Sequence, residues 1–317
     1  MSRAKLPLAR ALVRVAGWLV LALSLGFLGH SLWRSAPWSL AAANAAELAL
    51  AIGAGALAYG LAGFLLAEAW RQLLGPGAFR VGRRHYHALY GRTQIAKYLP
   101  GNCFHFVGRQ LLGRRLGHGH GALAFASLAE TVLLLAVAGI LSLPLLGPEL
   151  AHVPWPLPVW PALLAMAAVG LILMIVRPDG AWRRPAVSST LVALRSWAPR
   201  LSKAGLLHLA FFTVGGLTLW TVAAVAARAP GAQGIDLLGA VSALALGWWA
   251  GLAVPGAAAG AGVREAVLVL TLEQHLGAEG ALLVALALRV VTTMGDLLFF
   301  GLSCLTPAPS ATEERHP

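Results

Sequence analysis

Residues 44–69 read NAAELALAIGAGALAYGLAGFLLAEA, a run of 26 residues in which Glu47 and Glu68 are the only charged side chains. An α-helix rises 1.5 Å per residue, so about 20 apolar residues are enough to cross the roughly 30 Å hydrocarbon core of a bilayer. This stretch therefore predicts a transmembrane helix.

The composition of the whole chain points the same way. The 317 residues are 58% hydrophobic and 11% charged, with a mean hydropathy of +0.74, whereas a soluble domain has about 25% charged residues. We expect an all-α integral membrane protein with about seven to eight transmembrane helices, not a soluble enzyme. It forms a single polytopic domain over residues 1–305, followed by a disordered tail, 306–317. Besides 44–69, the expected spans are approximately 11–33, 122–146, 157–176, 204–227, 236–254 and 280–304.

The basic residues predict how these spans are oriented. The net charge is +12, and nearly all the cations lie between hydrophobic spans, which favours a role in topology and binding to anionic headgroups over nucleic-acid binding. They gather in the N-terminus and in two connectors, whereas three other loops hold only Arg34 and Arg228. By the positive-inside rule, a multi-pass protein of the bacterial inner membrane then has its N-terminus in the cytoplasm. The loops expected in the periplasm are 34–43, 147–156 and 228–235, and those expected in the cytoplasm include 70–84 and 177–203.

Two stretches, 85–121 and 255–279, are too polar or too broken to be simple spans. The first mixes histidines and arginines with aromatic residues, and the second begins with the glycine-rich sequence PGAAAGAG and continues as a short amphipathic helix. Both predict re-entrant or interfacial helical segments, since irregular backbone at membrane depth is tolerated where protein or water covers it.

The same two stretches resemble each other in sequence. Leu99-Pro100-Gly101 recurs as Val254-Pro255-Gly256, and an arginine follows eight residues after each of these glycines, at Arg109 and Arg264. Duplicated halves with broken segments in corresponding places are typical of transporters, which predicts repeat halves of about 44–147 and 204–304. A simpler interpretation is that Pro-Gly ends a helix twice. The loop charges favour a parallel repeat; if only one polar stretch crosses the membrane, the repeat is inverted.

Two charged residues occupy equivalent positions deep within apolar helices, Glu130 in the first half and Arg289 in the second. An ionised group at such a depth costs at least about 2.5 kcal/mol on insertion scales. We therefore predict that Glu130 and Arg289 face each other or share one cavity, with Asp296 as another partner for Arg289. Such a pair either only locks the two halves together or lines a polar pathway.

Other motifs carry little chemistry. The histidines at 85, 87, 118 and 120 lack further metal ligands, Cys103 and Cys304 are far apart, and no nucleotide-binding glycine loop occurs. The pattern Gly247-Trp-Trp-Ala-Gly251 favours close helix packing. We therefore expect no catalytic residues, no metal and no cofactor.

Two ordered motifs resemble a known family. Gln94-xx-Lys97-Tyr98-Leu99-Pro100-Gly101, followed by Gly108-Arg109 and Ser127-xx-Glu130, resembles the first signature of the lysylphosphatidylglycerol synthase transmembrane-region family, the flippase-like proteins. Val254-Pro255-Gly256, Gly260-x-Gly262-Val263-Arg264-Glu265 and the downstream Arg289 are similar to the second. The resemblance covers about 94–296. These 317 residues contain neither the soluble synthase domain of the bifunctional members nor a glycosyltransferase domain, so we do not expect them to make lysyl-lipid themselves.

The resemblance implies a flippase-like protein that moves a phospholipid or lipid-linked precursor between leaflets. Its partners are then membrane lipids, either anionic phospholipid or polyprenyl-phosphate-linked lipid, together with a separate synthase or glycosyltransferase. Two alternatives stay open: a membrane enzyme acting on a lipid phosphate through His105 or Glu130, and a non-transporting partner of a glycosyltransferase or synthase. The expected substrate-binding or pathway residues are Lys97, Tyr98, Pro100, Gly101, Arg109, Glu130, Pro255, Gly256, Gly262, Arg264, Glu265, Arg289 and Asp296.

Overall fold

The computed structural model of the chain describes residue 30 and residues 38–79, 81–98, 104–146, 187–228, 231–253 and 260–306. The expected helices at 11–33 and 157–176, the loop 147–156 and the tail beyond residue 306 lie essentially outside these ranges. So do Pro100, Gly101, Pro255 and Gly256.

Every regular element in the described ranges is helical, and none of these residues forms a strand. Four helices are long and apolar enough to cross a membrane, within Ala45–Leu73, His120–Leu145, Trp197–Ala226 and Val263–Cys304. This confirms the expected class, an all-helical multi-pass membrane protein. The elements are α2 (Trp38–Ala43), α3 (Ala45–Leu73), η1 (Pro76–Phe79), α4 (Arg83–Gln94), η2 (Ile95–Tyr98), α5 (Phe104–Arg115), α6 (His120–Ser142), η3 (Leu143–Leu146), α8 (Val187–Ala226), α9 (Leu237–Ala253) and α10 (Val263–Cys304).

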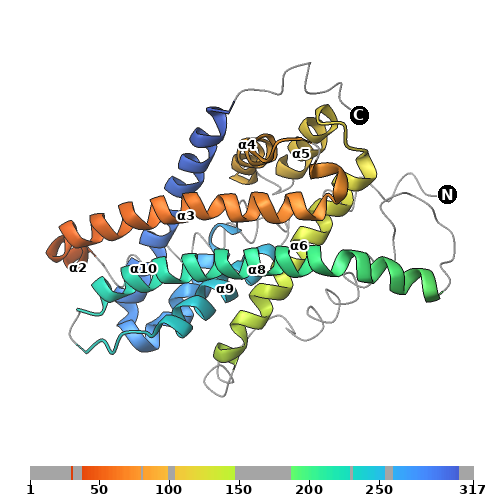
Figure 1. The fold of residues 1–317 in the computed structure, drawn as a ribbon. Coiled ribbons are helices and arrows are strands. Elements are labelled where there is room, and N and C mark those ends of the chain that lie inside the picture. The colour runs from red at the N-terminus through yellow and green to blue at the C-terminus, as the bar shows by residue number, and fades with distance from the viewer. Residues whose placement is uncertain are drawn as a thin grey trace, which may run out of the picture.

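Helices α3 and α8 form the central antiparallel pair and lie side by side in Figure 1. At one end, Arg228 forms an ion pair with Glu47. At the other, a Cβ atom on Gly75 would lie 3.5 Å from the Trp197 ring. We call these two ends of the bundle the Glu47 end and the Gly75 end. The described parts of loops 34–43 and 228–235 therefore lie at one end, and the described parts of 70–84 and of 187–203 at the other, as their charges predict.

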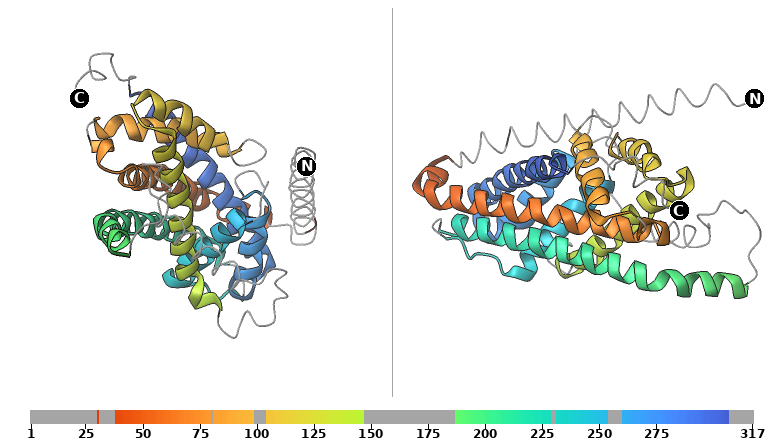
Figure 2. Two further views of the ribbon diagram at one scale, coloured as in Figure 1. Left: turned by 90° about the vertical axis from the view of Figure 1, so that its right-hand side faces the viewer. Right: turned by 45° about the horizontal axis from the view of Figure 1, so that its top comes forward.

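The polar stretch 85–121 contains a helical hairpin made of α4, η2 and α5, which we call the α4/α5 hairpin (Figures 1 and 2). It opens at the Gly75 end, where His118 lies 3.7 Å from a Cβ built on Gly77 and hydrogen-bonds the Tyr86 hydroxyl across 2.7 Å. Its tip points into the bundle, because Lys97 reaches Asp296 of α10.

Helix α9 and the first part of α10 form a second hairpin, the α9/α10 hairpin, which opens at the Glu47 end. The Gln233 amide there donates to the His275 carbonyl oxygen at 2.9 Å, and the Leu40 amide donates to Glu279 at 3.3 Å. A kink at Gly277, with φ +69°, then turns the chain back into the bundle.

The rest of α10 runs from the Glu47 end towards the Gly75 end. It crosses α3 where Gly60 meets Gly295; a Cβ on Gly60 would lie 2.8 Å from the Gly295 carbonyl oxygen, so only glycine permits this approach. Arg92 of α4 then donates to the Ser303 carbonyl oxygen at 3.1 Å. The end of α10 thus lies beside the last turn of α4. The segment 236–254, which we expected to cross the membrane on its own, coincides with α9 and is followed by the start of α10, which runs back alongside it.

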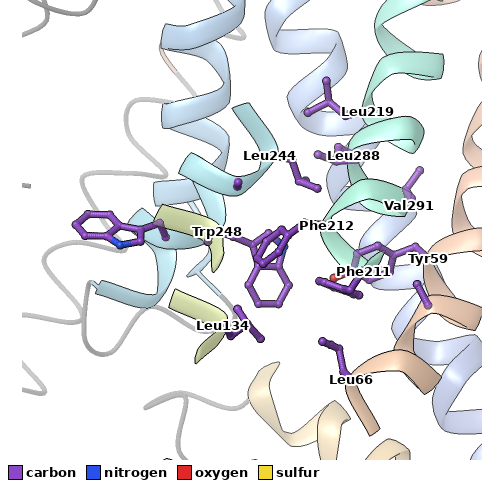
Figure 3. Close-up of a cluster of buried hydrophobic side chains, with 14 of the residues drawn as sticks. Tyr59, Leu66, Leu134, Phe211, Phe212, Leu219, Leu244, Trp248, Leu288 and Val291 are labelled. Carbon is purple, nitrogen blue, oxygen red and sulfur yellow. The ribbon is translucent and has the colours of Figure 1, made fainter. Parts of the chain in front are cut away.

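An aromatic cluster fills the middle of the bundle (Figure 3). Trp248 of α9 packs edge-on against Phe211 and Phe212, with ring centroids 5.5 and 5.9 Å away, and Phe211 in turn contacts Tyr59 of α3 at 5.4 Å. Since Tyr59 lies at the midpoint of α3 and Phe211 near that of the apolar part of α8, Trp197–Ala226, this cluster marks the central level of the two spans.

Candidate functional site

The tips of the two hairpins approach each other at this central level. Lys97, at the tip of the α4/α5 hairpin, lies 6.0 Å from the centroid of the Trp248 ring in the α9/α10 hairpin. Its ammonium group pairs with Asp296 at 2.7 Å, and the Tyr98 hydroxyl donates to the same carboxylate at 2.6 Å. The expectation that Asp296 would pair with Arg289 was therefore wrong.

Arg109 and Glu130 form the most deeply buried ion pair of the site. They are 1% and 3% exposed, and Arg109 Nη1 donates to Glu130 Oε2. Arg109 also donates to Gln94 at 2.8 Å, and its guanidinium group lies over the Tyr90 ring, whose hydroxyl donates to Glu130 at 2.7 Å. The predicted Glu130–Arg289 pair does not form, because a cation of the neighbouring helix in its own half already neutralises Glu130.

Arg289 instead pairs with Glu265, at 3.3 Å. Glu265 also accepts the Gly262 amide proton at 2.6 Å, which caps the start of α10. The Glu265 side chain is 6% exposed, but that of Arg289 is 28% exposed. This pair is more open than the Arg109–Glu130 pair.

Arg264 lies between these pairs without a carboxylate of its own. Its guanidinium group stacks over Trp248, 3.9 Å from the ring centroid. Cβ atoms on Gly251 and Gly260 would lie 2.8 and 2.7 Å from its Nε, so the two glycines make room for the side chain. Within the described part of the chain, Arg264 has no ion-pair or hydrogen-bond partner for its side chain, and its Nε is completely enclosed.

Two adjoining pockets surround these groups, and Trp248 and Arg264 belong to the walls of both. The larger has an empty volume of about 520 Å³ and includes Lys97, Arg109 and Glu130 in its lining. The smaller, of about 340 Å³, is lined by Glu265 and Arg289 among others. The Arg264 guanidinium group therefore separates two polar compartments inside an apolar bundle.

The histidines of the polar stretch do not form a metal site. Among the described residues no cluster of three or more metal-ligating side chains occurs; His87 contacts Glu68 at 3.1 Å and His118 contacts Tyr86. His105 lines the larger pocket. Burial, followed by the nearby Arg109 and Lys97 charges, lowers the pKa of His105 to about 3, so this imidazole is neutral at physiological pH.

The structure brings together nine of the thirteen residues that the motifs indicate, and the other four lie outside the described ranges. Three residues important for the geometry were not predicted as site residues: Tyr90, Trp248 and Gly251. The last two belong to the motif Gly247-Trp-Trp-Ala-Gly251, which we interpreted only as a packing motif. Gly247 and Gly251 of this motif do pack against the start of α10, and because they have no side chains they leave room for Arg264. The residues brought together are Lys97, Tyr98, Arg109, Glu130, Gly262, Arg264, Glu265, Arg289 and Asp296.

A scan against models of known protein families finds no match for this chain, and a search among curated protein sequences finds none either. The likeness to the lysylphosphatidylglycerol synthase transmembrane-region family thus rests on the two motifs. The function is argued below from the site itself.

Proposed function

We propose that this protein moves a phospholipid or lipid-linked precursor between the leaflets of the bilayer, and that Arg264 binds the lipid phosphate. The observation that carries the proposal is the guanidinium group of Arg264, which faces two pockets at the centre of a membrane bundle and has no carboxylate partner among the described residues. A partly buried cation without a counter-ion inside a membrane bundle is costly, and an anionic ligand removes that cost. Guanidinium groups match phosphate oxygens with two parallel hydrogen bonds.

The arrangement of the hairpins supports transport. The α4/α5 hairpin opens at the Gly75 end and the α9/α10 hairpin at the Glu47 end, and each leads into a long helix. We interpret the two units as an inverted repeat of re-entrant hairpins that approach each other near mid-membrane through Lys97 and Trp248. Inverted repeats with binding sites between interrupted helices support alternating access in secondary transporters.

The protonation and accessibility of the two candidate acid–base groups, His105 and Glu130, favour transport over catalysis. His105 is neutral with a pKa of about 3, and Glu130 is sealed against Arg109 and Tyr90. A general acid or base needs a pKa near the working pH and access to the reacting atom. Neither group meets both conditions, so we propose that the protein is not an enzyme.

We further propose that the Gly75 end faces the cytoplasm of a bacterium, because the basic connectors lie there. Single cysteines in loops 70–84 and 228–235, in a background without Cys103 and Cys304, can be labelled with an impermeant thiol reagent in intact cells. Labelling at 228–235 and protection at 70–84 is the expected result. Labelling at 70–84 alone would reverse the orientation.

Arg264→Ala tests the function directly. In reconstituted vesicles with fluorescent phospholipid, we expect the wild type to expose inner-leaflet lipid to a membrane-impermeant quencher and Arg264→Ala to lose at least about tenfold of that rate, as when a charge-assisted hydrogen bond is lost. Arg228→Ala, which removes an exposed cation at the Glu47 end, is the matched control. Equal rates in Arg264→Ala and wild type contradict the proposal, and a wild type without transport activity favours a non-transporting partner of a synthase or glycosyltransferase.

A further inference from the structure

The charges around the two pockets do not cancel. Lys97, Arg109, Arg264 and Arg289 are the cations that the structure places there, and Glu130, Glu265 and Asp296 are the carboxylates. Each carboxylate already holds one cation: Glu130 holds Arg109, Glu265 holds Arg289 and Asp296 holds Lys97. Among these described groups one positive charge remains, and it is located on Arg264.

From this balance we infer that the site selects a ligand group with a single negative charge, a phosphodiester, over a phosphomonoester or diphosphate. The inference rests on the proposed function and narrows its substrate class to phosphodiester lipids. A monoanion on Arg264 makes the buried cluster neutral without breaking any of the three ion pairs. A dianion would leave a net negative charge in apolar surroundings, or would have to displace a carboxylate from its partner, and both are costly.

The surroundings strengthen this dependence on charge. The guanidinium group of Arg264 rests on the Trp248 ring, and behind that ring lie Phe211 and Phe212. Gly251 and Gly260 enclose its Nε. Every other cation of the two pockets already holds a carboxylate, so no further unpaired cation among the described groups is available there to balance a second negative charge. The position of Arg264 in the wall of both pockets also lets one phosphodiester remain bound to the same cation as it passes from one pocket to the other.

The test is a binding competition on the full-length protein in detergent, read by native mass spectrometry. Phosphatidylglycerol, a phosphodiester, competes with phosphatidic acid of the same acyl chains. A phosphomonoester loses its second proton at about pH 6, so phosphatidic acid is mainly a dianion at pH 8 and a monoanion at pH 5. We expect phosphatidylglycerol to be preferred on the order of tenfold at pH 8, the effect of one unit charge about 10 Å away at an effective dielectric constant of about 20. The preference should largely disappear at pH 5.

Two variants change the charge balance in opposite directions. Arg264→Gln removes the unpaired charge and should abolish the preference. Asp296→Asn frees Lys97, raises the net charge by one and should shift the preference towards phosphatidic acid at pH 8. Arg228→Gln should bind as the wild type does, since its exposed ion pair lies at the Glu47 end. Size-exclusion profiles identify any variant that is not folded, and Asp296→Asn retains the test if Arg264→Gln fails to fold.

The outcomes separate this inference from the proposed function. Equal binding of both lipids at pH 8, or an Asp296→Asn variant that prefers phosphatidylglycerol as strongly as the wild type does, contradicts the inference that the site selects a singly charged phosphodiester. This holds even if the vesicles show transport. A preference for phosphatidylglycerol without transport supports the charge selection and contradicts the translocase. Soluble glycerophosphoglycerol distinguishes a lipid from a free headgroup: displacement of phosphatidylglycerol by the headgroup at equal concentration overturns the assignment to a lipid.

Discussion

The first and second halves of this protein neutralise their buried charges in opposite order along the chain. In the first half an arginine on the hairpin, Arg109, pairs with a carboxylate on the following helix, Glu130. In the second, a carboxylate at the start of α10, Glu265, pairs with an arginine further along the same helix, Arg289. Glu130 and Arg289 occupy corresponding positions, because each lies nine residues after the glycine of a Gly-Ala-Leu sequence, Gly121 in the first half and Gly280 in the second. Each of these two pairs thus lies within one half, Lys97 of the first half pairs with Asp296 of the second, and Arg264 is left without a carboxylate partner among the described residues.

The two pairs also differ in their exposure. Arg109 and Glu130 have side chains that are 2% and 4% exposed, and Tyr90 and Gln94 complete their hydrogen bonds. The side chain of Arg289 is 28% exposed, and its contact with Glu265 is 3.3 Å long. We interpret the first pair as a structural lock and the second as an accessible part of the pathway. Three substitutions test this distinction.

Glu130→Gln should have the largest effect on stability. It leaves Arg109 buried without a counter-charge, which costs about 3–5 kcal/mol when one partner of a buried pair is removed. The double variant Arg109→Gln/Glu130→Gln should recover part of this loss, because no unpaired charge remains. Denaturation in detergent measures both, with the exposed Glu273→Gln as a control. A double variant less stable than Glu130→Gln would contradict the structural lock.

Gly260→Ala should have an intermediate effect on stability and a strong one on transport. Gly260 has φ +70°, which costs a residue with a side chain about 1–2 kcal/mol, and the new methyl group would lie 2.7 Å from Arg264 Nε. Vesicle transport and thermal unfolding are the measurements. Gly53→Ala is the matched control, because a Cβ atom there meets nothing within 4 Å. Normal transport by Gly260→Ala would show that transport does not depend on the space that Gly260 leaves for the Arg264 side chain.

Arg289→Gln should change stability least, by about 1 kcal/mol or less, because a partly exposed ion pair contributes little and Glu265 keeps its hydrogen bond from Gly262. Transport should nevertheless fall, since Arg289 lines the smaller pocket. The comparison with Glu130→Gln is the informative one. If Arg289→Gln destabilises the protein as much as Glu130→Gln does, the two pairs do not differ in the way that their exposure indicates.

Much of the architecture follows from local sequence. Apolar length predicted α3, α6, α8 and the second part of α10, because a bilayer requires about 20 apolar residues wherever a helix crosses it. The polar stretch around 85–121 was recognised as unable to cross alone, and the loop charges sorted the connectors to two ends. Helix α9 was predicted from its apolar residues alone; only the hydrogen bond between Gln233 and His275 shows that it forms one arm of a hairpin with the start of α10.

The partners of the charges could not be predicted in the same way. Repeat positions and opposite signs favoured a pair of Glu130 with Arg289, but an ion pair depends on distances of a few ångströms that sequence spacing does not contain. Trp248 was likewise hidden in a packing motif, although its glycine neighbours make room for Arg264.

The sequence by itself determined that this chain is a helical membrane protein, where its four long apolar helices lie and which charges are too costly to face lipid, because these properties depend on apolar length and on desolvation, residue by residue. The tertiary structure alone decided that Glu130 belongs to Arg109, that Asp296 belongs to Lys97 and that Arg264 is left unpaired. The physical reason is that electrostatic energy inside the bundle depends on the distance between groups on different helices, and the packing of the two hairpins sets that distance.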